Sequence, residues 1–405
     1  MLRIHGYKES MAMSSTDILN NVRRLWPEFL VTAGNKPAVM VDKPTEKKVG
    51  LVQSVLRPQR TVRCAFLYNR TVEGSGWNYW HELGRRGIMS TFGNRVECTI
   101  RENVTPENAE EVIEELLQEG WEVIFATSPV FLDACLHMSV EHPKAKILNC
   151  SLTANYHHVR SYYLKIYEAK FILGALAGIL TDNDLIGYIA DYPICGVPTS
   201  INAFALGVKM TNPDANVLLE WSTIPGRNPE EELEKLGVNL ISGRDISAPG
   251  MDKNRSFGLY RMENDLPVNL GMPVWNWSKM YQDIIRSIMT DAFDSECRES
   301  DQALRYYMGM NTGAIDIVLS QKLGAAHSHL CSILQTAITS GSLHPFSDPL
   351  RDQSGAMRIA AGALPAPDEI IGMNYLAENV VGDIPDAAIL TPAAQEIVKM
   401  HGLKK

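Results

Sequence analysis

Residues 64–80, CAFLYNRTVEGSGWNYW, contain a strand, a turn with two glycines and the start of a helix. Residues 64–69 form a short, mostly apolar run that is typical of a buried parallel strand. Gly74-Ser75-Gly76 follows, and an amphipathic segment then runs from Trp77 to Phe92. In an open α/β sheet, such a turn lies at the carboxyl end of a strand, where ligands bind. The stretch therefore predicts an α/β fold and the position of a ligand site.

Strand and helix patterns alternate from residue 61 onward, with short connections between them. The expected strands are residues 64–69, 95–102, 121–127, 145–150, 185–190, 216–221, 238–242, 256–261 and 312–319. The expected helices are residues 77–91, 105–119, 130–141, 165–180, 199–210, 229–236, 278–291 and 323–339. Two successive α/β units of this kind predict two doubly wound parallel-sheet lobes with a cleft between them.

Residues 1–60 differ from the rest of the chain. A possible helix begins near Ser15 or Thr16 and runs through Leu25, and a proline-containing stretch follows. We expect this segment to be an extra arm. The predicted division is lobe 1 at residues 61–182 plus about 277–325, lobe 2 at residues 183–276 plus about 326–385, and a C-terminal tail at residues 386–405.

The composition excludes several classes of protein. The 405 residues are 45% apolar and 21% charged, as in ordinary globular proteins. A net charge of −9 argues against a nucleic-acid partner, which would require a basic surface. The longest apolar run, residues 171–180, is half of the roughly 20 residues that span a bilayer. We expect no membrane span, and we expect Gly174 and Gly178 to let this helix pack closely against a neighbour.

The cysteines and the N-terminal sequence indicate the cellular compartment in which the protein is expected. Seven cysteines without a CxxC pair fit reduced thiols better than a disulfide framework. The first 20 residues contain no apolar signal segment and no lipid-anchor cysteine. The sequence as written therefore predicts a cytoplasmic protein. The alternative is a periplasmic or cell-surface location, if the natural precursor has a signal.

Common catalytic and cofactor motifs do not fit. Gly74-Ser75-Gly76 is the start of a dinucleotide fingerprint, but Tyr79 stands at the third glycine position and Trp77 stands where backbone must approach a pyrophosphate. P-loop and nucleophile-elbow motifs are absent from the sequence. Only His327 and Cys331 share a face of a predicted helix, which is too few ligands for zinc. We expect no cofactor, no metal and no catalytic residue.

The expected strand ends instead carry aromatic, amide and carboxylate side chains, a set that suits a flat heteroaromatic ligand such as a purine. These residues are Asn69, Trp77, Asn78, Ser128, Phe131, Asp133, Asp191, Tyr192 and Asp245. For single residues the alternatives stay open. Trp77 and Phe204 could be core aromatics, and Asp133 could be a first-turn acid that the helix dipole stabilises.

An ordered set of motifs resembles the basic membrane protein family, which comprises the purine and purine-nucleoside receptors of bacterial ABC importers. The motifs are Gly76-Trp77-Asn78-Tyr79, residues 124–128 (IFATS) with Phe131 and Asp133, residues 167–169 (YEA) with Leu173-Gly174, residues 201–207 (INAFALG), residues 273–277 (PVWNW), and residues 344–346 (HPF) with residues 352–355 (DQSG). The resemblance covers about residues 62–385. It implies the type I periplasmic-binding-protein fold, with two α/β lobes joined by a multi-crossover hinge.

The resemblance also implies roles for single residues. Trp77 matches the first-lobe position that stacks on the purine, and Phe204 matches the one that closes on it from the second lobe. Asn78 and Asp133 match hydrogen-bonding positions, and Asp245 matches a second-lobe acid. Trp275 and Trp277 match a hinge-side strand that borders the cleft, where a structural role is the alternative.

One departure from the family bears on the ligand. Nucleoside-binding members carry an Asp just before the aromatic-Asn pair, where this chain has Gly74-Ser75-Gly76. This difference favours a free base such as adenine or hypoxanthine.

We therefore predict a non-enzymatic purine-binding protein that closes by hinge motion. It would serve an ABC permease, or act as a cytosolic sensor with a partner bound through residues 1–60. The alternative is an enzyme acting on nucleosides, with Asp133 or Asp245 as general base.

Overall fold

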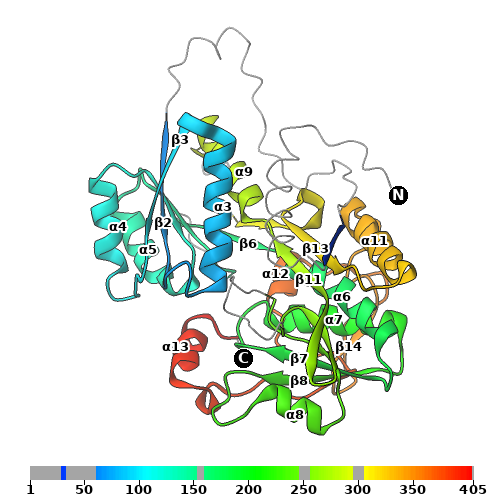
Figure 1. The fold of residues 1–405 in the computed structure, drawn as a ribbon. Coiled ribbons are helices and arrows are strands. Elements are labelled where there is room, and N and C mark those ends of the chain that lie inside the picture. Colours follow the sequence, from blue (N-terminus) through cyan, green and yellow to red (C-terminus); the bar gives the residue numbers. More distant parts are fainter. Residues whose placement is uncertain (1–28, 33–60, 153–158, 246–255, 295–304, 404–405) are drawn as a thin grey trace. The chain divides into compact units, whose positions relative to one another are not determined.

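A computed structural model describes residues 29–32, 61–152, 159–245, 256–294 and 305–403 (Figure 1). The chain divides into two compact units. Of the described residues, unit 1 contains 61–152, 159–164, 276–294 and 305–308, and unit 2 contains 29–32, 165–245, 256–275 and 309–403. The predicted helix near Ser15 lies outside the described residues.

Unit 1 is built on a parallel sheet with the strand order β12-β6-β5-β4-β2-β3. Its strands are β2 (Val62–Leu67), β3 (Val96–Arg101), β4 (Val123–Ala126), β5 (Lys146–Asn149), β6 (Arg160–Leu164) and β12 (Arg305–Met308). Its helices are α3 (Gly76–Phe92), α4 (Ala109–Gln118), α5 (Leu132–Glu141) and α9 (Trp277–Met289). α4 and α5 cover one face of the sheet, and α3 packs with α9 on the other (Figure 1).

Unit 2 contains a larger mixed sheet with the order β1-β13-β11-β10-β9-β7-β8-β16. Its strands are β1 (Phe29–Thr32), β7 (Leu185–Ala190), β8 (Asn216–Trp221), β9 (Leu240–Ser242), β10 (Leu259–Glu263), β11 (Leu266–Trp275), β13 (Ile315–Ser320) and β16 (Val380–Val381), and β14 (Leu350–Arg351) pairs separately with β15 (Met357–Ile359). Its helices are α6 (Ile166–Leu180), α7 (Val197–Thr211), α8 (Pro229–Lys235), α11 (Ala325–Ser340), α12 (Pro367–Ile371) and α13 (Pro392–His401).

The α/β class with two mainly parallel sheets is confirmed, but the second sheet was predicted incompletely. β9, β10, β11 and β13 pair antiparallel. Periodicity did not predict the ten-residue strand β11, because Pro267 and Pro273 interrupt its pattern and proline is unusual inside a sheet. The family resemblance implied a strand only near its end, at Trp275. Within the predicted arm, β1 pairs with β13 at the edge of this sheet.

The predicted close packing of the apolar helix α6 is confirmed. α6 lies against α7, and a side chain at Gly174 would meet the backbone oxygen of Phe204. Gly178 has the same relation to the backbone of Val208. The two helices therefore approach each other closely because α6 has glycine, without a side chain, at these two contacts.

Candidate functional site

The turn after β2 presents Trp77 and Asn78 at the start of α3. Ser75 caps the helix, and its hydroxyl accepts a hydrogen bond from the Asn78 backbone N–H at 3.3 Å. This cap explains why the glycine-containing turn ends where it does. Trp77 and Asn78 thus stand in the first helical turn, where the cap fixes their backbone.

The Trp77 ring is held from several sides within unit 1. Its Nε1–H donates to the Thr127 carbonyl at 2.7 Å, just beyond the end of β4. The ring is edge-on to His81 at 4.8 Å and to Trp277 at 5.5 Å, and it is nearly parallel to Tyr163 at 6.2 Å. Trp77 itself is half-buried. The ring is therefore fixed in place while part of it stays accessible.

Asn78 connects the loop after β2 to α3. Its Nδ2 donates to Asn69 Oδ1 at 3.2 Å and to the Arg70 carbonyl at 2.9 Å. Its Oδ1 is buried and has no hydrogen-bond partner among the described residues. Asn149, directly at the end of β5, has the same kind of unpartnered buried oxygen. Because buried polar atoms are almost always hydrogen-bonded, two amide acceptors remain for an N–H donor.

The other first-lobe residues predicted from sequence lie in different surroundings. Ser128 is buried after β4, where its hydroxyl accepts from the Val130 N–H at 3.4 Å. Phe131 is fully buried in the core between the sheet, α4 and α5. Asp133 is exposed in the first turn of α5, as the helix-dipole alternative expects. The structure thus brings together Asn69, Trp77 and Asn78.

Sequence reasoning did not single out His81, which is buried one helical turn after Trp77. Its Nδ1 lies 2.5 Å from the Tyr281 hydroxyl, and its ring stacks on Trp277 at 4.1 Å. Burial holds the pKa of His81 well below its usual range, so the imidazole is neutral. The i, i+4 spacing from Trp77 could have indicated the contact.

In unit 2, Phe204 and Asp245 belong to a buried cluster around Lys170. The Phe204 ring has no exposed surface and meets Tyr188 edge-on at 5.3 Å. The fully buried Lys170 ammonium donates to Asp245 Oδ1 at 2.7 Å and to Ser242 Oγ at 2.9 Å. Burial raises the pKa of the Asp245 carboxyl, and Lys170 opposes that rise. The stacking role of Phe204 and the ligand contact of Asp245 stay predictions.

Three further predicted residues follow or end strands of unit 2 in the sequence. Asp191 follows β7, and its carboxylate accepts a hydrogen bond from the Ser222 hydroxyl. Trp275 is the last residue of β11 and is buried. Trp277, which was expected on the same strand, instead opens α9 in unit 1 because Asn276 caps that helix.

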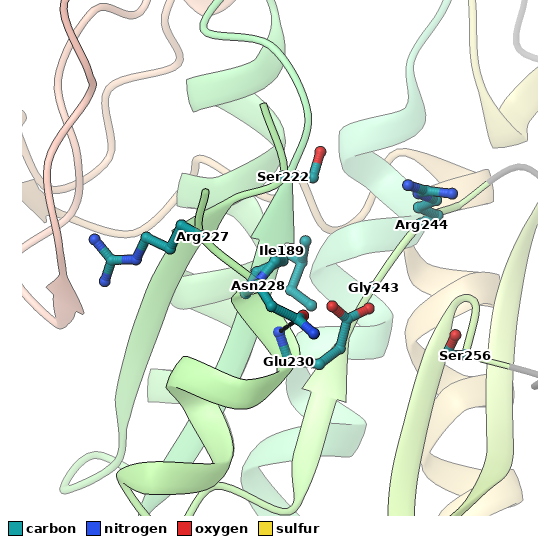
Figure 2. Close-up of a pocket in the computed structure, with 9 residues that line it drawn as sticks. Ile189, Ser222, Arg227, Asn228, Glu230, Gly243, Arg244 and Ser256 are labelled. Carbon is teal, nitrogen blue, oxygen red and sulfur yellow. Dashed lines mark hydrogen bonds between the residues drawn. The ribbon is translucent and has the colours of Figure 1, made fainter. Parts of the chain in front are cut away.

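A hollow of about 260 Å³ lies at the carboxyl ends of β7, β8 and β9 (Figure 2). It is lined by Ile189, Ser222, Arg227, Asn228, Pro229, Glu230, Gly243, Arg244 and Ser256. At these strand ends the sequence analysis named Asp191, Tyr192 and Asp245, and none of them lines the hollow. Arg244 stands just before Asp245, yet it lines the hollow while Asp245 is bound to Lys170. We name these nine residues the unit 2 hollow.

The described residues contain no group of three His, Cys, Asp or Glu side chains that could hold a metal ion. Within the same ranges, no helix is long and apolar enough to cross a membrane.

Comparison with known proteins identified related sequences and folds. Residues 61–223 match the family described as ABC transporter substrate-binding protein PnrA-like. A purine-binding protein of Brucella abortus is 24% identical over 81% of this chain and 95% of its own length. A putative ABC transporter glucose-binding protein of Haloferax volcanii is 24% identical over 62% of this chain and 66% of its own.

A solved structure supports the fold. An ABC transporter solute-binding protein of Conexibacter woesei superposes with a TM-score of 0.52 at 15% identity, over 70% of this chain and 98% of its own. The likeness extends to the two-sheet α/β architecture described above.

Proposed function

We propose that this chain is a non-enzymatic solute-binding protein whose solute is a free purine base, because residues 61–223 match the PnrA-like family of ABC transporter substrate-binding proteins. The Brucella abortus relative, which is described as purine-binding and matches most of this chain, supports the purine. The Gly74-Ser75-Gly76 turn, which lacks the acid of nucleoside-binding members, supports a base without a sugar.

The observation that carries the proposal is the arrangement of Trp77 and Asn78. A half-buried indole supplies a face for stacking, and the Asn78 oxygen needs an N–H donor. Purines present both a flat ring and N–H groups. Stacking of a base on an aromatic side chain contributes about 1–3 kcal/mol. Trp77 and Asn78 are therefore the residues whose change should matter most for binding.

A thermal-shift panel tests the proposal. Adenine, hypoxanthine, guanine, their nucleosides and glucose are added at concentrations far above micromolar, where linkage predicts a rise in Tm for any ligand that binds the folded state. We expect the bases to raise Tm and the nucleosides to raise it less. Glucose serves as the alternative solute suggested by the Haloferax relative.

Trp77→Ala should remove most of the shift. Trp121→Ala is the matched control, because Trp121 stacks under the Arg63 guanidinium elsewhere in unit 1. A shift with glucose and none with purines would contradict the proposal. An undiminished purine shift in Trp77→Ala would show that the stacking assignment is wrong.

A further inference from the structure

Two charged side chains of the unit 2 hollow have no side-chain partner among the described residues. Neither the Arg244 guanidinium nor the Glu230 carboxylate has a hydrogen bond or ion pair within the described part of the chain, and both are exposed. Three other polar side chains of the hollow are engaged. Arg227 binds Glu220 at 2.7 Å and Asn228 donates to Glu231 at 2.8 Å, while Ser222 donates to Asp191. Arg244 and Glu230 therefore remain available to a solute.

The two groups also do not bind each other, although they carry opposite charges and line one hollow. A guanidinium donates pairs of hydrogen bonds to acceptors, and a carboxylate accepts from N–H donors. A solute that uses both must carry acceptors on one edge and an N–H donor on a neighbouring edge. The volume of the hollow also limits the size of the solute, because it lies below the roughly 300–1,000 Å³ of pockets for drug-sized ligands. A hollow of about 260 Å³ fits a single base better than a base with a sugar.

We propose that the unit 2 hollow selects 6-oxopurines, with Arg244 donating to O6 and N7 and Glu230 accepting the ring N1–H. This inference rests on the proposed function. Paired hydrogen bonds from arginine to O6 and N7 are the commonest specific contact to guanine. Adenine has an amino donor beside N7 and no N1–H, so it would place a donor against Arg244 and an acceptor against Glu230. Hypoxanthine and guanine share the matching edge.

Isothermal titration of the full chain with hypoxanthine, guanine and adenine tests the selection. We expect both oxopurines to bind about tenfold to a hundredfold more tightly than adenine, as a paired contact of this kind discriminates. Arg244→Gln and Glu230→Gln should each reduce the preference to a few-fold. Both side chains are exposed, so unchanged thermal unfolding of the variants would show that the fold is kept.

Arg227→Gln is the matched control. Arg227 lines the same hollow, but its side chain extends away from the Glu230 carboxylate (Figure 2), and it is held by Glu220. This variant should keep the preference. Adenine binding as tightly as hypoxanthine, or a preference that survives in both Arg244→Gln and Glu230→Gln, would overturn the oxopurine inference and leave purine binding intact. The absence of binding by all three bases would overturn the proposed function as well.

Discussion

Two clusters, one in each unit, bury polar groups in opposite ways. In the unit 1 cluster beside Trp77 the buried imidazole is neutral, with His81 stacked on Trp277 and adjacent to the Tyr281 hydroxyl. In unit 2 a full positive charge is buried, since the Lys170 ammonium contacts Asp245 and lies 4.5 Å from the Tyr188 ring centroid. Two similar α/β layers can therefore support an aromatic neutral site in one case and a charged polar site in the other. Each difference can be tested by substitution.

The largest expected effect is the loss of the buried charge. Lys170→Met leaves Asp245 without its cation, and removing one partner of a buried pair costs about 3–5 kcal/mol. The Asp245 side chain keeps 21% exposure, so we expect a loss of about 2–4 kcal/mol in the free energy of unfolding, measured with urea. Lys209→Met breaks the exposed pair with Glu378 and should cost about 0–1 kcal/mol. Equal losses in the two variants would contradict the structural role of Lys170.

The contact between α6 and α7 should be nearly as sensitive. Gly174→Ala places a methyl group against the Phe204 backbone oxygen, which cannot move as a side chain would. Overpacking of this kind typically costs about 1–3 kcal/mol. Gly324→Ala is the control, because a methyl group there would make only ordinary contact with His327. Chemical denaturation gives the free energy of unfolding of both variants. An unchanged free energy of unfolding in Gly174→Ala would show that the two helices separate easily.

The buried neutral imidazole of His81 predicts that the stability of the fold depends on pH. The folded-state pKa of His81 lies below its unfolded value of about 6.5, so the unfolded chain binds more protons below that pH. The contribution of His81 to stability is present above about pH 6.5 and falls as pH decreases, by up to about 1.4 kcal/mol per pH unit. Thermal unfolding between pH 7 and pH 5 should decline less steeply in His81→Phe. Parallel profiles for the two proteins would contradict a buried neutral imidazole.

The smallest expected effect concerns the cap that presents Trp77. Ser75→Ala removes the acceptor for the Asn78 N–H and should cost about 1 kcal/mol in unfolding free energy. Thr91→Ala, in the last turns of the same helix, is exposed and should change stability by less than about 0.5 kcal/mol. A Ser75→Ala protein as stable as Thr91→Ala would show that the turn holds its shape without the cap.

The sequence predicted those strands and helices whose apolar residues repeat at regular spacing. β7 and β8 match the expected bounds, because a six-residue, mostly apolar run between polar turns has few alternatives. β11 was missed because its prolines obscure a strand whose hydrogen bonds come from long-range pairing. Such pairing depends on tertiary context that a local pattern does not contain.

The candidate site residues also differ in whether local sequence could place them. Trp77 and Asn78 follow a strand and a cap within a dozen residues, so local sequence placed them on the turn. Arg244 and Glu230 come from separate elements and resemble ordinary exposed charges in the sequence. Their lack of partners in one hollow became visible only when β9 and α8 were placed together.

Equilibrium binding of hypoxanthine to the full wild-type chain tests the central claim most directly. Titration calorimetry should give a Kd of about micromolar or tighter, corresponding to roughly −8 kcal/mol. The affinity should fall at least about fivefold in Trp77→Ala, in line with the loss of one stacking contact. Absence of binding by hypoxanthine, guanine and adenine at millimolar concentration would contradict the assignment of a purine as the solute.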